Sequence, residues 1–447
     1  MANFIADRFN LLPRKRQAHF VFLLFFVLSE YLNVGMLHNA LFVFCLLLAA
    51  PVVAADWPQW LGPNRDGHAD DKIVAPAGDG DFKELWKYTV GVGWATPVIS
   101  DGRLIIHHRV GADERIDCLD SKTGELLWKR SFVSNYRDRF GMEEGPRSTP
   151  TIADGKVFTH GPQGLLSCHD LKTGKPVWTV DLAKRFGSPQ GFFGRCSSPL
   201  VLGKRVIVDV GGRIDGKDAG VAAFDLNSGK LAWSSTKETN DYSSPQGMQV
   251  GKRSCALFFT RGGFTGVDAQ TGRPLFFEAF RSPIDASVNA ATPMVIGDQV
   301  FLTSCYDVGA AVWRLAEGNG GGSPKLLWKK GGALDAHYAT PVHRDGFLYG
   351  FHGRQERGPE LRCVDLSDGT VKWTSGRMAA GSLLCSDDKL VVVTEDGELL
   401  LVEASPKAYK VLHRQQVVGF GARAAPSIAN GFLYVRDKRR LSCFSLK

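Results

Sequence analysis

One stretch of the sequence, residues 149–180, reads as a small four-stranded sheet that cannot be stable alone. Its predicted strands are separated by turn residues and cover Thr149–Ala153, Lys156–His160, Leu165–His169 and Pro176–Val180. An Asp-Gly pair between the first two strands is typical of a hairpin turn. A sheet of about 32 residues leaves apolar surface on both faces, so copies of it must stack against one another. The chain is therefore predicted to be a repeat protein.

The same pattern recurs along the chain, and two independent markers each count it eight times. Most units begin at a Ser/Thr-Pro pair or its Ala-Pro equivalent, at Thr96, Thr149, Ser198, Ser244, Thr292, Thr340 and Ala425. The last interval is nearly two periods long, and a degenerate unit within residues 383–412 fills it. The predicted fourth strands are marked by Trp86, Trp128, Trp178, Trp233, Phe276, Trp328, Trp373 and the strand Tyr409–Leu412. No window after residue 60 shows sustained helical periodicity, so the predicted fold class is all-β.

The two ends of the repeat array complement each other. The final unit stops after its third strand, Leu441–Ser445, whereas an isolated strand, Glu84–Tyr88, precedes the first complete unit. A strand from the N-terminal side that completes the last sheet closes the ring and removes its open edges. We therefore predict an eight-bladed β-propeller of four-stranded antiparallel blades over residues 84–447. An irregular segment, 56–83, and a leader, 1–55, precede it.

A second motif, Asp-x3-Gly-x3-Trp, joins the third strand of a unit to the fourth. The aspartate is expected to cap the turn, the glycine to take a positive φ, and the indole to pack on the neighbouring blade. Five copies, one ending in Phe instead of Trp, begin at Asp120, Asp170, Asp225, Asp268 and Asp365. In this motif the chain resembles the tryptophan-docking repeats of the quinoprotein (PQQ-type) β-propellers, over about residues 84–447. That superfamily includes quinone-dependent alcohol dehydrogenases and outer-membrane assembly lipoprotein propellers. The opening, Asp56–Gly67, is similar to that of secreted PQQ-like repeat proteins of planctomycete-type bacteria.

The N-terminus predicts export. Residues 36–55 have an apolar core followed by small residues, as in a cleaved secretory signal peptide that starts at Met36. The alternative is an uncleaved membrane anchor that begins near Phe20. We therefore expect a periplasmic or extracellular protein, held at a membrane if the leader is retained.

Charge and cysteine content exclude two further classes of protein. The formal net charge is +8, but the basic residues are scattered and not interleaved with aromatic ones, so no nucleic-acid partner is expected. Four cysteines, Cys118, Cys168, Cys363 and Cys443, occupy the same slot in different units. Equivalent positions in separate sheets are too far apart to be bridged, which predicts buried free thiols and no disulfide framework.

The candidate site follows from propeller geometry. The first strand of each blade lines the central channel, so the residues just before each Ser/Thr-Pro pair should surround one mouth. These residues are Trp94, Arg147, Arg195, Tyr242, Asn289, His337 and Arg423, and a polar turn at residues 351–357 adds His352 and Arg354. Arginines beside an aromatic residue and a histidine suit an anion, a sugar or an acidic peptide. The alternative is that these polar groups bind only water and one another.

This site predicts a non-catalytic binding or assembly scaffold for a protein, peptide or glycan, monomeric and without a cofactor or metal. The resemblance implies an alternative, a PQQ-dependent dehydrogenase, which would need a calcium site beneath the quinone and two adjacent cysteines. The sequence has no Cys-Cys pair, and no pattern ties the nearby carboxylates Glu143 and Glu144 to calcium. His107 and His108 are adjacent on one strand, so they face opposite sides and cannot chelate one ion together.

Overall fold

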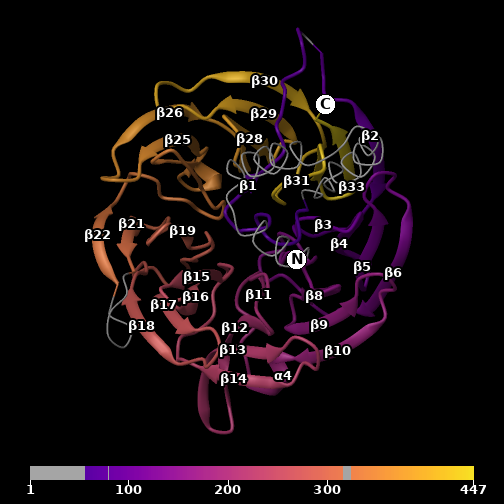
Figure 1. Ribbon diagram of the computed structural model, residues 1–447, viewed down its shortest axis with the longest axis vertical. Helices are drawn as coiled ribbons and strands as arrows, with labels where there is room; N and C mark the ends of the chain where they lie inside the picture. The colour runs from indigo at the N-terminus through magenta and orange to yellow at the C-terminus, as the bar shows by residue number, and fades with distance from the viewer. Residues whose placement is uncertain (1–55, 79, 316–323, 447) are drawn as a thin grey trace, which may run out of the picture. The chain divides into compact units, whose positions relative to one another are not determined.

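A computed structural model describes residues 56–78, 80–315 and 324–446. These residues form eight antiparallel four-stranded blades arranged in a ring, a β-propeller (Figure 1). The predicted fold class is confirmed. The leader, 1–55, lies outside the described residues, and within them no helix has the length and apolarity to span a bilayer.

The strands follow one another from the channel outward in every blade. Blades one to four contain β3 (Val98–Ser100), β4 (Arg103–Val110), β5 (Asp113–Asp120), β6 (Leu126–Val133), β7 (Thr151–Ala153), β8 (Lys156–His160), β9 (Leu165–Asp170), β10 (Pro176–Asp181), β11 (Leu200–Leu202), β12 (Arg205–Ile214), β13 (Lys217–Asp225), β14 (Leu231–Ser235), β15 (Gln246–Val250), β16 (Arg253–Phe259), β17 (Gly263–Asp268) and β18 (Pro274–Ala279). A short helix, α4 (Leu182–Phe186), follows β10, begins at the Asp181 cap and ends at Gly187.

Blades five to eight repeat the arrangement. They contain β19 (Met294–Ile296), β20 (Gln299–Ser304), β21 (Gly309–Arg314), β22 (Lys325–Lys330), β23 (Val342–Arg344), β24 (Phe347–His352), β25 (Glu360–Asp365), β26 (Val371–Arg377), β27 (Gly381–Ser386), β28 (Lys389–Thr394), β29 (Glu398–Glu403), β30 (Val411–Gln416), β31 (Ser427–Ala429), β32 (Phe432–Arg436) and β33 (Arg440–Ser445). A 3-10 turn, η2 (Gln355–Arg357), follows β24. The fourth strand of blade seven, β30, begins and ends later than the predicted strand Tyr409–Leu412.

The ring is closed as predicted. Strand β2 (Glu84–Thr89) pairs antiparallel with β33 and is the outermost strand of the last blade. Trp86 on β2 lies opposite Cys443, so the first strand of the propeller supplies the position that the end of the chain leaves open.

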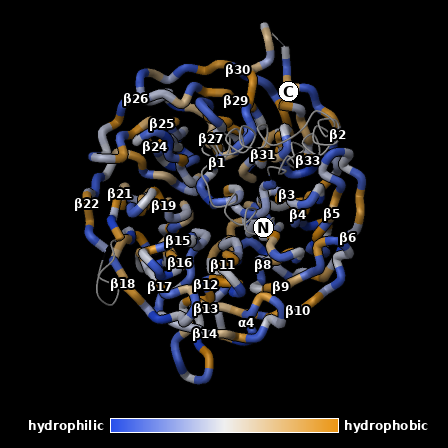
Figure 2. The backbone as a smooth tube through the Cα atoms, viewed as in Figure 1, coloured by the Kyte–Doolittle hydropathy of each residue, from blue (hydrophilic) through white to orange (hydrophobic). Residues whose placement is uncertain are grey.

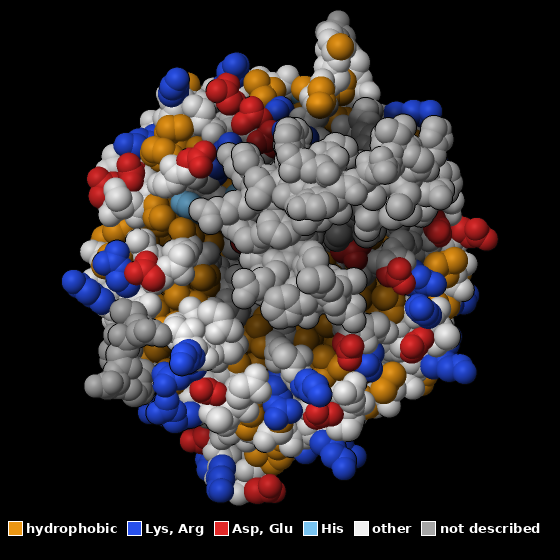
Figure 3. Space-filling model, viewed as in Figure 1, with side chains coloured by type: hydrophobic (Ala, Val, Ile, Leu, Met, Phe, Trp, Pro, Cys, Tyr) orange, Lys and Arg blue, Asp and Glu red, His pale blue; other side chains and the backbone are white. Residues whose placement is uncertain are grey.

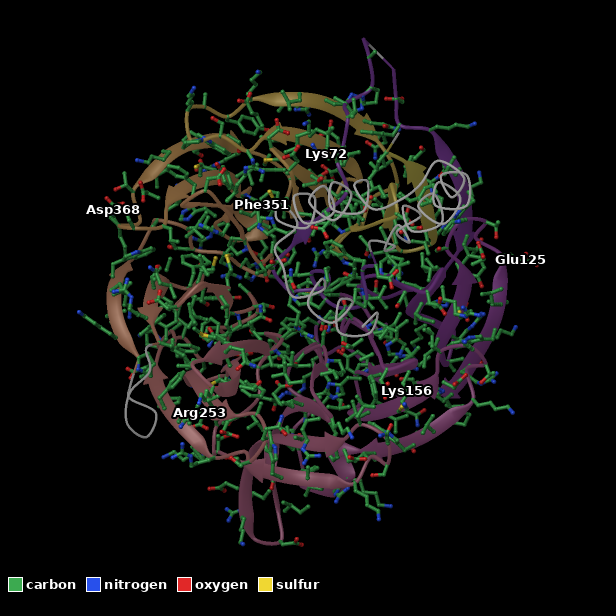
Figure 4. All side chains as sticks on the ribbon, in the orientation of Figure 1. Lys72, Glu125, Lys156, Arg253, Phe351 and Asp368 are labelled. Atoms are coloured by element: carbon green, nitrogen blue, oxygen red, sulfur yellow. The ribbon has the colours of Figure 1, made fainter. Side chains whose placement is uncertain are left out.

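The tryptophan motif holds neighbouring blades together. The Trp128 indole N–H donates to the carbonyl of Leu171 in the next blade (3.0 Å), and the indole ring lies flat beneath Gly174. A Cβ on Gly174, whose φ is +66°, would come within 2.5 Å of that ring. Indoles at Trp86, Trp178, Trp233 and Trp328 make the same two contacts. Figure 4 places Glu125 and Asp368, both in these turns, at the periphery of the ring.

The Ser/Thr-Pro pairs that mark the repeats form a second set of bonds between blades. At four of the blade junctions the backbone N–H of one residue donates to the hydroxyl of its equivalent in the next blade: Thr96 to Thr149 (3.1 Å), Thr149 to Ser198 (2.9 Å), Ser198 to Ser244 (3.0 Å) and Thr292 to Thr340 (2.9 Å). The ring is therefore tied near the channel by hydroxyls and at the periphery by indoles.

The hydrophobic core is divided into clusters that lie between neighbouring blades. Phe158 and Trp178 of blade two share one buried cluster with Phe224 of blade three. In Figure 2 hydrophobic residues recur along the strands of every blade, while Figure 3 shows acidic and basic side chains interspersed around the visible face. The eight cysteines in the described part of the chain are free, and burial raises the pKa of the Cys118 thiol to about 12. This confirms the prediction of free, buried thiols.

The N-terminal segment is more structured than expected. Its strand β1 (His68–Ala69) adds to β27 as a parallel fifth strand in blade seven. Trp57 pairs with Ile99 in blade one, and Ile152 of blade two donates to the carbonyl of Pro58. The segment therefore crosses one end of the channel and contacts several blades.

Candidate functional site

The first strands of all blades run in the same direction along the channel, so the residues that precede them lie at one end. A cavity of about 400 Å³ opens there, which we call the mouth cavity. Six of the nine predicted residues line it: Trp94, Arg147, Tyr242, His337, Arg354 and Arg423. Residues from five blades and from the 351–357 turn thus converge on a single space.

The other three predicted residues do not face this cavity. Arg195 is only 2% exposed and donates to the carbonyl of Val210 (3.1 Å). The Asn289 side chain is buried and donates to the carbonyl of Thr260 (2.9 Å). His352 lines a neighbouring pocket instead. Sequence position alone could not show these directions, because they depend on how each loop folds back on its own blade.

Arg147 is held rigidly by its own loop. Its Nη2 lies 2.5 Å from the buried carboxylate of Asp138, and a second bond runs to the carbonyl of Glu143 (3.1 Å). Its guanidinium lies 4.5 Å from the centre of the Trp94 ring and 5.1 Å from that of Phe193. A charge that is both ion-paired and stacked on aromatic faces is stable at a partly dry site.

Arg423 approaches Trp94 as well. Its guanidinium carbon lies 4.7 Å from the ring centre, and its Nε is 3.1 Å from the carboxylate of Glu395. The hydroxyl of Tyr338 donates to the same carboxylate (2.7 Å). The Trp94 ring therefore contacts two guanidinium groups, each of which has its own carboxylate.

The third arginine of the mouth cavity, Arg354, also contacts an aromatic ring and a carboxylate. Arg354 lies 4.8 Å from the Tyr306 ring centre and 3.3 Å from a carboxylate oxygen of Glu356. The Tyr306 hydroxyl is 2.9 Å from Nε2 of His337. Burial lowers the pKa of His337 to about 4, so this imidazole is neutral at pH 7. All three arginines of the mouth cavity are thus charge-balanced, which makes the site less cationic than the sequence suggested.

Aromatic side chains form most of the remaining wall. They are Trp60, Phe140, Phe192, Phe193, Tyr306 and Tyr338, and sequence reasoning did not select any of them. The signal was present in the long loops before Arg147 and Arg195, which carry Phe140 and the pair Phe192–Phe193. The Tyr242 hydroxyl fixes that pair by accepting the backbone N–H of Phe192 (2.7 Å).

The N-terminal segment closes the cavity at its inner end. Trp60 lines the cavity and donates its indole N–H to Thr292 Oγ1 (2.9 Å). Arg65 inserts between blades and donates to the carbonyls of Ser198 (3.2 Å) and Pro199 (2.9 Å). Burial lowers the pKa of this arginine, which is 2% exposed. The segment 56–83, which was predicted to be irregular, therefore forms the floor of the mouth cavity.

Two carboxylates lie buried behind the wall. Desolvation raises the pKa of Asp209 to about 6, partly offset by Arg195. Desolvation also raises the pKa of Asp241 to about 7, although the backbone N–H of Asn289 donates to it (2.9 Å). They support the loop that carries Tyr242 and do not reach the mouth cavity, since neither lines it.

The residues at the mouth do not fit a calcium-bound quinone. Glu356, the carboxylate that lines the cavity, is engaged by Arg354, and the Asn289 amide is turned away to Thr260. Cys196 is a single thiol. Across the described ranges no three His, Cys, Asp or Glu side chains converge as a metal site.

The adjacent histidines and the carboxylate Glu143, considered from the sequence as possible ligands, are engaged elsewhere. His107 bonds to Glu114 (2.8 Å) and His108 to Asp117 (2.9 Å), so the adjacent histidines do face different partners. Glu143 is buried, and its backbone carbonyl supports Arg147.

Comparison with known proteins places the chain in a family. The model described as outer membrane protein assembly factor BamB matches residues 112–375, more than half of the chain. The BamB of Burkholderia pseudomallei is 25% identical over 358 residues, which cover 71% of this chain and 87% of that protein. A quinone alcohol dehydrogenase subunit from Acetobacter aceti is 31% identical over 173 residues, covering 37% of this chain. The chain spans about a quarter of the first quinoprotein relatives, 26% of the quinohemoprotein alcohol dehydrogenase ADH-IIG of Pseudomonas putida and 23% of the A. aceti subunit.

Solved structures show the same fold. BamB from Moraxella catarrhalis has a TM-score of 0.60 at 14% identity and covers 82% of this chain and 100% of its own. Quinohemoprotein alcohol dehydrogenase from Comamonas testosteroni has a TM-score of 0.61 at 13% identity, covering 88% and 80%. Together with the repeat motif and the ring, the family match leads to one conclusion: the chain belongs to the PQQ-like repeat family of β-propellers whose model is described as outer membrane protein assembly factor BamB.

Proposed function

We propose that this protein is an exported, non-catalytic scaffold whose mouth cavity binds a segment of a partner protein. The single observation that carries the proposal is that an aromatic cavity is open to solvent while its arginines are already balanced by carboxylates. Such a cavity gains most from an apolar or aromatic side chain, because burying one requires no new charge compensation.

The rim of the cavity supports the same proposal. Phe140 is 60% exposed at the mouth, and Phe420, 72% exposed, lies in the loop that leads to Arg423. Large apolar side chains in such positions are enriched at protein interfaces, where they become the main contributors to affinity. The relatives named outer membrane protein assembly factor are consistent with a scaffold role. A glycan remains the competing ligand for the same cavity.

Site-specific photo-crosslinking tests the proposal. A photoreactive phenylalanine replaces Phe140, and a matched control replaces Phe277, which is 45% exposed on the outermost strand β18. We expect a protein adduct in native envelopes from position 140 only, and loss of that adduct when Tyr306→Ala reshapes the cavity. Equal adducts from both positions, or an adduct that glycosidase removes, would contradict a peptide ligand.

The second candidate function is a quinone-dependent dehydrogenase, which the quinoprotein relatives and the flat Trp94 face favour. Reconstitution with PQQ and calcium, followed by absorbance spectroscopy, separates the two candidates. A bound-quinone spectrum with alcohol-dependent bleaching would support the enzyme; an unchanged spectrum is expected from the scaffold, because the donors at the mouth do not match a calcium site.

A further inference from the structure

The polar turn at residues 351–357 builds a second pocket beside the mouth cavity. This side pocket has a volume of about 380 Å³ and shares Tyr306 and Arg354 with the mouth cavity as a common wall. His352, Arg357 and Arg377 line it on the far side of that wall. The two spaces are therefore adjacent, and one ligand can reach both.

His352 presents a hydrogen-bond donor there. Its Nδ1 accepts the backbone N–H of Asp335 (3.0 Å), so the proton of the neutral ring is on Nε2. Burial lowers the pKa of His352 to about 4, which keeps the ring neutral at pH 7. A neutral imidazole with this tautomer can donate from Nε2 to an anion in the pocket.

Several charged groups of the side pocket are already satisfied. Arg362 pairs with Glu360 (3.2 Å), and the Thr374 hydroxyl donates to the same carboxylate (2.8 Å). Asp335 accepts the backbone N–H of Gly332 with both oxygens (3.0 and 3.1 Å). These groups shape the pocket and have little capacity left for a ligand.

Two arginines remain available. Arg357 and Arg377 are exposed, and within the described part of the chain neither guanidinium has a carboxylate at ion-pair distance. The Arg377 side chain lies across Gly358, where a Cβ would be 3.6 Å from its nearest atoms. Two carboxylates of the pocket also lack an ion-pair partner in the described residues: the exposed Asp307 and the half-buried Asp335, whose oxygens accept only the backbone N–H of Gly332. Desolvation raises the pKa of Asp335, so the exposed Asp307 is the more fully charged of the two opposing groups.

We infer that the side pocket binds side-chain carboxylates, so that the ligand of the mouth cavity is a peptide segment with acidic residues next to an aromatic one. This inference rests on the proposed function and specifies its partner. The aromatic residue occupies the mouth cavity, while a carboxylate receives the Nε2–H of His352 and the guanidiniums of Arg357 and Arg377. Asp307 and Asp335 favour a singly charged carboxylate over a more highly charged anion, because repulsion grows with the charge of the ligand.

Calorimetric titration with two defined peptides tests the inference. Acetyl-Trp-Asp-Asp-amide and acetyl-Trp-Asn-Asn-amide differ only in charge, so the first reports both pockets and the second reports the mouth cavity alone. We expect the acidic peptide to bind the wild-type protein roughly tenfold tighter in 20 mM NaCl, with a smaller ratio in 200 mM NaCl.

Matched variants locate the effect. The Arg357→Gln/Arg377→Gln protein should bind both peptides with the affinity that the wild type has for the neutral one. The control, Lys172→Gln/Lys175→Gln, removes the same charge from an exposed turn at the other end of the propeller and should keep the tenfold ratio. Asp307→Asn should tighten binding of the acidic peptide about twofold.

Each outcome bears on one of the two proposals. Equal binding of both peptides to the wild type, or a ratio that survives Arg357→Gln/Arg377→Gln, overturns the acidic preference and leaves the scaffold proposal intact. Failure of both peptides to bind overturns the peptide-binding cavity itself, and the inference about acidic residues with it.

Discussion

Substituting alanine at two glycines with the same backbone angle isolates the energy of tryptophan docking. Gly155 and Gly174 both have φ +66°, but a Cβ on Gly155 has nothing within 4 Å, whereas one on Gly174 would be 2.5 Å from the Trp128 ring. Gly155→Ala should therefore cost only the left-handed backbone strain, about 1–2 kcal/mol.

Gly174→Ala has the same strain and must also displace the indole. Removing a buried tryptophan costs about 3–5 kcal/mol, and its hydrogen bond contributes about 1 kcal/mol. Because the ring shifts and is not deleted, we expect roughly half of that sum, about 2–3 kcal/mol, beyond the cost of Gly155→Ala.

Urea unfolding followed by circular dichroism and tryptophan fluorescence measures the difference. The two variants expose the same surface on unfolding, so the free energy of unfolding falls with urea concentration at the same slope in both. The difference between their transition midpoints, multiplied by this slope, gives the difference in stability. Gly174→Ala should also shift the native emission spectrum, since the Trp128 indole loses its bond to the carbonyl of Leu171. Equal destabilisation of the two variants, within about 0.5 kcal/mol, would refute docking as the bond between blades.

Three further predictions concern single side chains. Burial lowers the pKa of His160 to about 3, below the unfolded value near 6.5, so between these values the unfolded chain binds a proton that the folded chain does not. The free energy of unfolding should therefore fall by about 2 kcal/mol between pH 6.5 and 5. Urea midpoints measured across this pH range should show the fall in the wild type and a smaller one in His160→Leu, which cannot bind the proton. The Tyr88 hydroxyl on β2 donates to Asp117 on β5 of blade one (2.9 Å), so Tyr88→Phe should cost about 1–2 kcal/mol and increase hydrogen exchange in β2 and β5 more than in β9; uniform exchange would contradict this. Cys168 is fully buried and burial raises the pKa of its thiol to about 12, so this thiol should react with iodoacetamide in the native protein far more slowly than in urea at pH 8; equal rates would contradict its burial.

Much of the fold could be predicted because its bonds are repeated. Each unit carries its own proline pair and its own indole, so one misread unit, such as the late strand β30, did not change the count of eight. The closing strand was predictable for a related reason, since a three-stranded final unit leaves one position to be filled.

The candidate site was less predictable because its determinants are not repeated. The carboxylates that balance the arginines, Asp138 and Glu395, approach the mouth only after their loops fold inward. Trp60 reaches the cavity from a segment without periodicity, and its contact with Thr292 joins residues 232 positions apart. Spacing along the chain identified the arginines that could reach the mouth, but not the carboxylates that would neutralise their charge.

The closing strand also determines when the propeller can be finished. β2 is made early and its partner β33 is the last strand of the chain, so in synthesis from the N-terminus this pairing comes after every other. Joining them closes a loop of roughly 350 residues, with an entropic cost of about 5 kcal/mol. The docking of Trp86 and the hydrogen bonds between β2 and β33 must together offset this cost. Until then blade eight has an unprotected edge, which can bind chaperones or other strands. Completion of the ring is therefore a single late event, and a chain that lacks β33 should keep the edges of β2 and β32 exposed.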